Sequence, residues 1–388
     1  MVGRRGRLTL ASPTVIADHF DHLADPRRAQ GRLHRLDHIL TIALCAVVSG
    51  ADGWDDIAAF AEAAEPWLKE RLKLRHGVPS ADTIRRVVAA IAPEAFERGF
   101  ARWVESVAER TAGEVVAIDG KTLRRSYDTD DPRAMLHMVS AWAGQQHLVL
   151  AQQAVDAKSN EITAIPALLG VLDVRGCIVT LDAMGTQTAI AAQIQKQGAD
   201  YVLALKGNHE MLHGEVRDFF ETLVVASPAA SGQACYAETR EIGHGRKEVR
   251  RLWASSDVAW LRERQAWAGL ASLVMVESER HVGGAVTRQR RYFLSSVGAS
   301  GPGDAARLLG AVRDHWGIEN RVHWVLDVVF REDESRVRRD HGAANLSVMR
   351  RLGLNLLRSA VTERRRSLRM RRKMAGWDLA FLAAVVGL

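Results

Sequence analysis

The sequence predicts an α/β protein: a mixed sheet with flanking helices, a β-rich insertion and a helical N-terminal domain. Apolar residues repeat at helical spacing through residues 33–108. From residue 114, three consecutive strand patterns are followed by a helix, a strand, a helix and a strand. Between residues 235 and 298, short β patterns alternate with glycine turns, and helical spacing returns after Gly303.

Composition excludes several classes of protein. The chain has 388 residues, of which 47% are hydrophobic and 26% charged, so we expect several folded units rather than a disordered, collagen-like or coiled-coil chain. Its three cysteines form no CxxC motif, which excludes a disulfide framework and a cysteine zinc site. No signal-peptide pattern is present, and no apolar segment approaches the roughly 20 residues that cross a bilayer. We therefore expect a cytoplasmic protein without a membrane partner.

The N-terminal helical residues predict a bundle of four or five helices. Ser80 has the side chain and the position to cap a helix that carries Ile84, Val87 and Val88. Packing of this helix in the bundle is the preferred interpretation, and insertion into the major groove of DNA is the alternative.

The remaining elements follow from short apolar segments. The sheet is predicted from strands at 115–118, 135–142, 148–155, 177–181 and 201–205, with helices at 162–172 and 189–194. The insertion is predicted from strands at 248–253, 273–276 and 288–294.

Two strands of the predicted sheet each deliver an aspartate at their end. Asp119 follows the strand at 115–118, and Asp182 follows the strand at 177–181. Two carboxylates that meet at one sheet edge repel each other, so such a pair implies a shared cation or a raised pKa. Hard divalent cations are held by carboxylates in this way. The alternative for each aspartate is a plain turn residue.

Glu319 is the third candidate. On a helix expected from Ala311 to Phe330 it shares a stripe with Val312 and Val322, and an inward glutamate is costly unless its charge is compensated. A metal ion shared with the two aspartates would compensate it. His315 or His323, four residues away on either side, is the alternative partner. A zinc site built on Glu319 and His323 lacks further ligands at suitable spacing.

These residues lie in motifs that resemble the DDE transposases of bacterial insertion sequences, in the branch of the H-repeat-associated proteins. The motifs are Ala-Ile-Asp-Gly-Lys-Thr around Asp119, Thr-Leu-Asp-Ala around Asp182 and His-Trp-x-Ile-Glu-Asn-x-x-His-Trp-x-Leu-Asp around Glu319. Asp25-Pro-Arg and Pro79-Ser-x-Asp-Thr-x-x-Arg extend the resemblance to the N-terminal region.

The resemblance implies a ribonuclease H-like sheet and a catalytic triad of Asp119, Asp182 and Glu319 that binds two Mg²⁺ ions, or Mn²⁺ in their place. It also implies hydrolysis at the element ends, attack of the freed 3′-OH on target DNA, and a homodimer on the terminal inverted repeats. Better-known relatives carry Tyr-x2-Arg-x3-Glu-x6-Lys, and this chain has Val312, His315, Glu319 and Leu326 there. Only the glutamate matches, so the roles of the other three residues are not carried over.

Basic residues predict where DNA would bind. Residues 350–373 hold ten basic side chains against one acidic one, which favours salt-sensitive phosphate contacts, with a solvated helix as the alternative. Trp316 and Trp324 are interpreted as core residues, and the acids between 327 and 334 as exposed partners of arginines. The expected DNA contacts are Lys121, Arg124, Lys206, Arg313, His315, Asn320, Arg321, Arg364, Arg365, Arg366, Arg369, Arg371 and Arg372.

The expected organisation has six segments. An N-terminal tail covers residues 1–20, a helical domain that could bind DNA 21–110, the first part of the core 111–230, the β-rich insertion 231–300, the second part of the core 301–360, and a basic C-terminal tail 361–388. We expect a nucleoid-associated protein. A metal-dependent nuclease without strand transfer and a catalytically silent DNA-binding descendant are the alternative functions.

Overall fold

The computed structural model describes residues 19–109, 113–126, 135–155, 161–225, 234–243, 245–262 and 264–388. The expected tail over residues 1–20 lies almost wholly outside them. The strands are β1 (Val115–Thr122), β2 (His137–Ala143), β3 (Leu148–Val155), β4 (Ile178–Leu181), β5 (Asp200–Leu205), β6 (Cys235–Gly243), β7 (Arg246–Ser255), β8 (Ser272–Val282) and β9 (Ala285–Ser295). The helices are α1 (Leu36–Ser49), α2 (Trp54–Ala63), α3 (Glu65–Leu72), α4 (Ala81–Ala90), α5 (Pro93–Val107), α6 (Glu161–Gly170), α7 (Thr188–Lys196), α8 (Glu210–Val225), α9 (Pro302–Ile318), α10 (Trp324–Val328), α11 (Gly342–Ser359), α12 (Leu368–Trp377) and α13 (Leu379–Val386).

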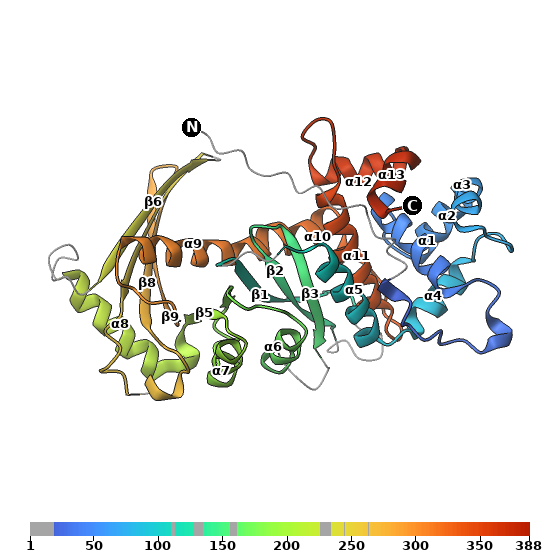
Figure 1. The fold of residues 1–388 in the computed structure, drawn as a ribbon. Helices are drawn as coiled ribbons and strands as arrows, with labels where there is room; N and C mark the ends of the chain where they lie inside the picture. The colour runs from blue at the N-terminus through green and yellow to red at the C-terminus, as the bar shows by residue number, and fades with distance from the viewer. Residues whose placement is uncertain are drawn as a thin grey trace.

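The described strands form one mixed sheet in the order β3-β2-β1-β4-β5-β9-β8-β7-β6 (Figure 1). Strands β1, β4 and β5 are parallel, β2 pairs antiparallel with β1, and β3 pairs antiparallel with β2. The predicted α/β class with a mixed sheet is confirmed. The β-rich segment does not fold apart from this sheet, because β9 pairs antiparallel with β5 and continues it.

Helices cover both faces of the sheet, as the alternation of side chains along β1 requires. Val115 packs into a cluster with Leu308 of α9, whereas Val116 and Ile118 pack with Ile165 of α6. Figure 1 shows α9 along one face and α6, α7 and α8 on the other. Helix α9 therefore crosses β1 and β4 on the face where the acidic residues gather.

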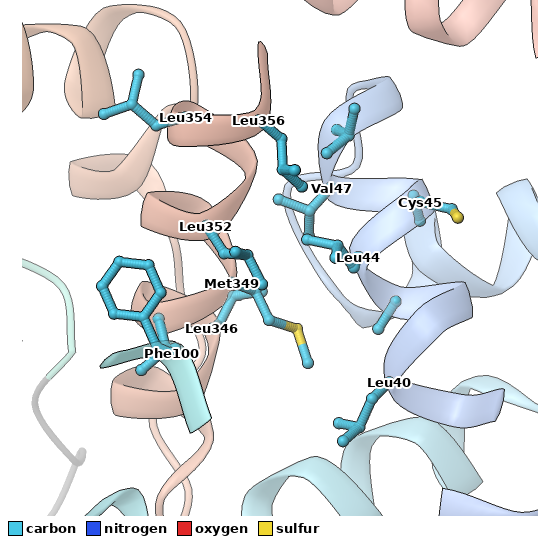
Figure 2. Packing of buried hydrophobic residues seen from close by; sticks show 14 of the residues in the cluster. Leu40, Leu44, Cys45, Val47, Phe100, Leu346, Met349, Leu352, Leu354 and Leu356 are labelled. Atoms are coloured by element: carbon cyan, nitrogen blue, oxygen red, sulfur yellow. The ribbon is translucent and has the colours of Figure 1, made fainter. Parts of the chain in front are cut away.

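The N-terminal helices form a bundle around α11. Leu44 and Val47 of α1 face Leu346, Met349 and Leu352 of α11 (Figure 2). Helix α11 also contacts α4, α5 and β3. Residues 342–359, expected to continue the core, thus join the sheet to the N-terminal bundle, because α11 is buried on every side.

Residues 361–388, expected as a basic tail, fold into α12 and α13 and pack against α1. The apolar residues of α13 explain this, since Leu382, Val385 and Val386 are buried. Ser80 caps α4 as predicted, with its Oγ accepting a hydrogen bond from the Thr83 amide at 3.3 Å.

No single helix among the described residues is long and apolar enough to cross a membrane. Helices α1 and α2 meet the criterion of length and composition only as a pair bent by 97°.

Candidate active site

Asp119 and Asp182 lie side by side because β1 and β4 are parallel neighbours. Ile118 pairs with Leu181, and each aspartate is the next residue of its chain segment. Asp119 lies within β1, which continues to Thr122 instead of ending before the aspartate. The Oδ1 atom of Asp182 accepts hydrogen bonds from the amides of Met184 and Gly185, at 3.0 and 3.1 Å, which orients that carboxylate.

Glu319 begins a π-helical turn, Glu319–His323, between α9 and α10. The sequence predicted a continuous α-helix here, and a wider turn changes the direction in which side chains point. Val322 and His323 are buried, whereas Glu319 is exposed, so the expectation of a buried glutamate is wrong. Its side chain lines a cavity of about 330 Å³ together with Asp119 and Asp182.

The acidic side chains of this cavity affect one another's ionisation. Burial and the nearby charges of Glu319 and Asp182 raise the pKa of Asp119 to about 7. Burial lowers the pKa of His315 to about 4 and that of His323 to about 3. Both imidazoles are therefore neutral near pH 7 and do not compensate the carboxylates.

The two histidines have other contacts. The Nδ1 atom of His315 is hydrogen-bonded to Oγ1 of Thr180 at 3.0 Å. The Nδ1 atom of His323 lies 3.6 Å from Oδ2 of Asp119. In the described part of the chain neither histidine forms an ion pair with Glu319, so the alternative of a Glu–His pair is not what the structure contains.

The chemistry of the site fits a hard divalent cation. Three carboxylates line one cavity, and burial together with the charges of Glu319 and Asp182 raises the pKa of Asp119. Among the described residues, no three acidic, histidine or cysteine side chains are close enough to enclose a metal ion by themselves. Mg²⁺ does not require such a cage, because it keeps several waters and binds through one or two carboxylates plus substrate phosphates.

Three cationic side chains line the same cavity. Lys206, which the sequence singled out, follows β5, and Arg290 and Arg291 lie on β9. Both arginines were missed by the sequence analysis, although the density of arginines in β9 was visible there. Burial and the charge of Arg250 lower the pKa of Arg291.

The expectation that Lys121 contacts DNA does not fit its position, because the side chain is buried. Its Nζ lies 2.8 Å from Asp327, 2.9 Å from Asp333 and 3.4 Å from Glu332. Glu332 is itself buried and is ion-paired with Arg351 at 3.0 Å. The interpretation of these acids as exposed partners of surface arginines is therefore wrong for Glu332.

Arg372 also lies inside the molecule. Its guanidinium donates to the carbonyl oxygen of Val47 at 3.2 Å and to Asp52 at 3.1 Å, which fastens α12 to α1. Arg371 donates to the Leu357 carbonyl oxygen at 2.9 Å, at the end of α11. The remaining expected DNA contacts outside the cavity are exposed: Arg124, Arg313, Asn320, Arg321, Arg364, Arg365, Arg366 and Arg369.

The interpretation of two tryptophans as core residues is wrong. Trp316 is 44% exposed and Trp324 is 58% exposed. The guanidinium of Arg291 lies over the Trp316 ring, 4.7 Å from its centre, at the margin of the cavity that Asp119, Asp182 and Glu319 line.

Comparison with known proteins agrees with the motifs. Residues 110–356 match the family model described as Transposase DDE domain, and residues 17–104 match the one described as DDE_Tnp_1-associated. The protein named "Uncharacterized protein in dhlA 3'region" of Xanthobacter autotrophicus is 48% identical over 71% of this chain and 92% of its own length. The "H repeat-associated putative transposase YhhI" of Escherichia coli K12 is 37% identical over 96% of this chain and 97% of its own length. The "Putative transposase YncI" of Escherichia coli O157:H7 is 39% identical over 93% of this chain and 91% of its own length. The chain belongs to the DDE transposase family.

Proposed function

We propose that the chain is the transposase of an insertion sequence, which hydrolyses DNA at the element ends and transfers the freed 3′-OH to target DNA. Asp119, Asp182 and Glu319 are its catalytic residues. The observation that carries the proposal is the gathering of these three carboxylates around one cavity, where burial and the charges of Glu319 and Asp182 raise the pKa of Asp119 to about 7. Membership of the DDE transposase family supports it.

The fold of the catalytic part is ribonuclease H-like in this proposal. The order β3-β2-β1-β4-β5 supports it, with an antiparallel β1–β3 unit and two further strands parallel to β1. Strands β6–β9 then form the insertion between Asp182 and Glu319.

The three carboxylates would hold two Mg²⁺ ions, or Mn²⁺ in their place. Bound divalent cations lower the pKa of an attacking water or hydroxyl and neutralise charge on the phosphate. Asp119 is the ligand that both ions would share, because its carboxylate is close enough to feel the charges of both Asp182 and Glu319. Lys206 and Arg291, on the same cavity, would attract the negatively charged phosphate.

Two reactions use this one site. In the first, water attacks the phosphorus at the element end, the P–O3′ bond breaks, and a 3′-OH and a 5′-phosphate are released. In the second, that 3′-OH attacks a phosphorus of the target, and the target's own 3′ oxygen leaves as a hydroxyl. Neither step needs a covalent intermediate on the protein. A homodimer on two paired ends would bring both element ends to one target.

The test uses the purified full chain, Mg²⁺, a labelled duplex with the gene's own flanking ends, and an acceptor DNA. We expect cleavage and joining by the unchanged protein, and loss of both in Asp182→Asn and Asp119→Asn with DNA binding kept. Glu62→Gln, which changes an exposed acid on α2, is the matched control and keeps both reactions.

Other results of this assay would support a different function. Full activity of Asp182→Asn would refute the assignment of the triad. Cleavage without joining would indicate a nuclease. Binding without any metal-dependent reaction would indicate a silent DNA-binding descendant.

A further inference from the structure

Two basic cavities lie on either side of the π turn that carries Glu319. The strand cavity, of about 760 Å³, lies between β7–β9 and α9. The connection cavity, of about 670 Å³, is bounded by the π turn, the end of α11 and the residues that connect α11 to α12. Asn320 and Arg321 line both cavities, so the two meet at the π turn.

The strand cavity also opens onto the catalytic cavity. Gln289, Arg291 and Trp316 line both of them. The strand cavity therefore adjoins both the catalytic cavity and the connection cavity, and Glu319 lies on the turn beside them.

The two basic cavities differ in how their charge is balanced. In the strand cavity, Glu248 pairs with Arg246 at 3.1 Å, and Glu279 pairs with Arg288 at 3.0 Å. The lining of the connection cavity holds five arginines and one acid, Glu363. The lining of the strand cavity holds seven arginines and three acids, so the two linings carry the same net charge. Five of those seven arginines are ion-paired, whereas among the described residues none of the five arginines of the connection cavity is.

Arg321 and Arg358 form the wall of the connection cavity nearest the π turn. Within the described residues, neither has a carboxylate oxygen within ion-pairing distance. The guanidinium of Arg358 lies 4.5 Å from the centre of the Trp142 ring, which holds it in place. Burial and the charge of Arg321 lower the pKa of Arg358 to about 9, which shows the cost of keeping these two cations together.

We propose that the connection cavity binds the phosphate backbone of duplex DNA, and that the DNA runs from there over the π turn to the catalytic cavity. Arginine suits this role because its planar guanidinium matches two phosphate oxygens at once. Duplex DNA is favoured over an acidic protein partner because the connection cavity adjoins the strand cavity, which in turn adjoins the catalytic cavity. The proposal rests on DNA being the substrate in the proposed function.

Two pairs of arginines between residues 364 and 369 make it possible to distinguish a specific phosphate site from non-specific electrostatic attraction of DNA. Arg365 and Arg366 line the connection cavity. Arg364 and Arg369, which the sequence also suggested as DNA contacts, are exposed in the same segment but do not line the connection cavity, so the proposal assigns them no phosphate contact. Replacing either pair by glutamine removes the same charge, and since all four side chains are exposed, neither change disturbs the core.

The experiment measures binding of a fluorescein-labelled duplex by anisotropy over a series of salt concentrations, in an Asp182→Asn background that prevents cleavage. We expect Arg365→Gln/Arg366→Gln to weaken binding and to reduce the slope of log K against log salt by about 2, one unit for each lost phosphate contact. Arg364→Gln/Arg369→Gln should leave the slope within about half a unit of the parent. Equal losses in both pairs, or no loss in either, would overturn the proposal.

A second measurement locates the DNA directly. Val361 is 68% exposed on the connection cavity, and Trp377 is 71% exposed on α12 outside it. A photocrosslinker on Val361→Cys should capture the duplex, whereas one on Trp377→Cys should not, and the reverse pattern would overturn the proposal. Both readouts are independent of catalysis, so a failure of the strand-transfer reaction leaves them interpretable.

Discussion

Glu332 connects the β-sheet to the helical bundle through buried ion pairs. Its side chain is completely buried, 3.0 Å from Arg351 of α11 and 3.4 Å from Lys121 of β1. Ser347 also donates a hydrogen bond to it, at 3.1 Å. The change Glu332→Gln keeps the shape of this side chain and removes only its charge. It therefore measures what the ion pairs contribute to the free energy of unfolding.

The magnitude follows from the pKa of Glu332. Burial alone would raise it, but the positive charges of Arg351 and Lys121 lower it from 4.5 to about 2. A shift of that size corresponds to about 3 kcal/mol at pH 7, within the range for breaking a buried pair. Because the folded state depresses the pKa, this stability is fully present above about pH 5 and is lost as the pH falls toward 2.

Urea unfolding at several pH values tests this prediction. The difference between the unchanged protein and Glu332→Gln should be about 3 kcal/mol near pH 7 and should shrink on acidification. Glu334→Gln is the control, because Glu334 is exposed and pairs with the exposed Arg331, a kind of pair worth less than about 1 kcal/mol. A difference below about 1 kcal/mol for Glu332→Gln, or one that grows as the pH falls, would refute the reasoning.

Further predictions concern stability. Without divalent cations, Asp119→Asn should be more stable than the unchanged protein at about pH 8. The reason is that the pKa of Asp119 is raised to about 7 in the folded state, so its ionisation destabilises the fold. The gain in stability should vanish below about pH 4, where the carboxyl group is protonated in both states. Added Mg²⁺ should raise Tm only in the unchanged protein. Glu97→Gln should likewise become relatively more stable as the pH rises from 4.5 through 8, because burial raises the pKa of Glu97 to about 8. In urea, Gly376→Ala should cost about 1–3 kcal/mol, since its Cβ would lie 2.7 Å from the carbonyl oxygen of Ser49. Gly310→Ala should instead stabilise α9 by up to about 1 kcal/mol, because its Cβ would meet nothing within 4 Å.

The sheet and its aspartates were predictable because local pattern and parallel pairing determine them. The strand before Asp182 is buried along its whole length, and such a segment is recognised without knowledge of its partners. Strand β6 was missed because its side chains are mostly polar and partly exposed, so no apolar alternation marks it. The π turn was missed for a different reason. An extra residue in one turn leaves no trace in composition, yet it decides whether Glu319 points into the core or into the cavity.

The sequence gives only the number of charged residues in a segment. Whether each of them is exposed or buried and paired depends on the residues that the fold places next to it. Arg350, Arg351 and Arg372 belong to the basic segment, and all three are buried. Their partners, Asp52 and Glu332, are far away in the sequence or separated by a turn, so no local pattern reveals them. Buried arginines of this kind hold α11 and α12 against the bundle and the sheet. The basic segment therefore exposes fewer positive charges than its sequence implies, and Arg365 and Arg366 are among those that stay exposed.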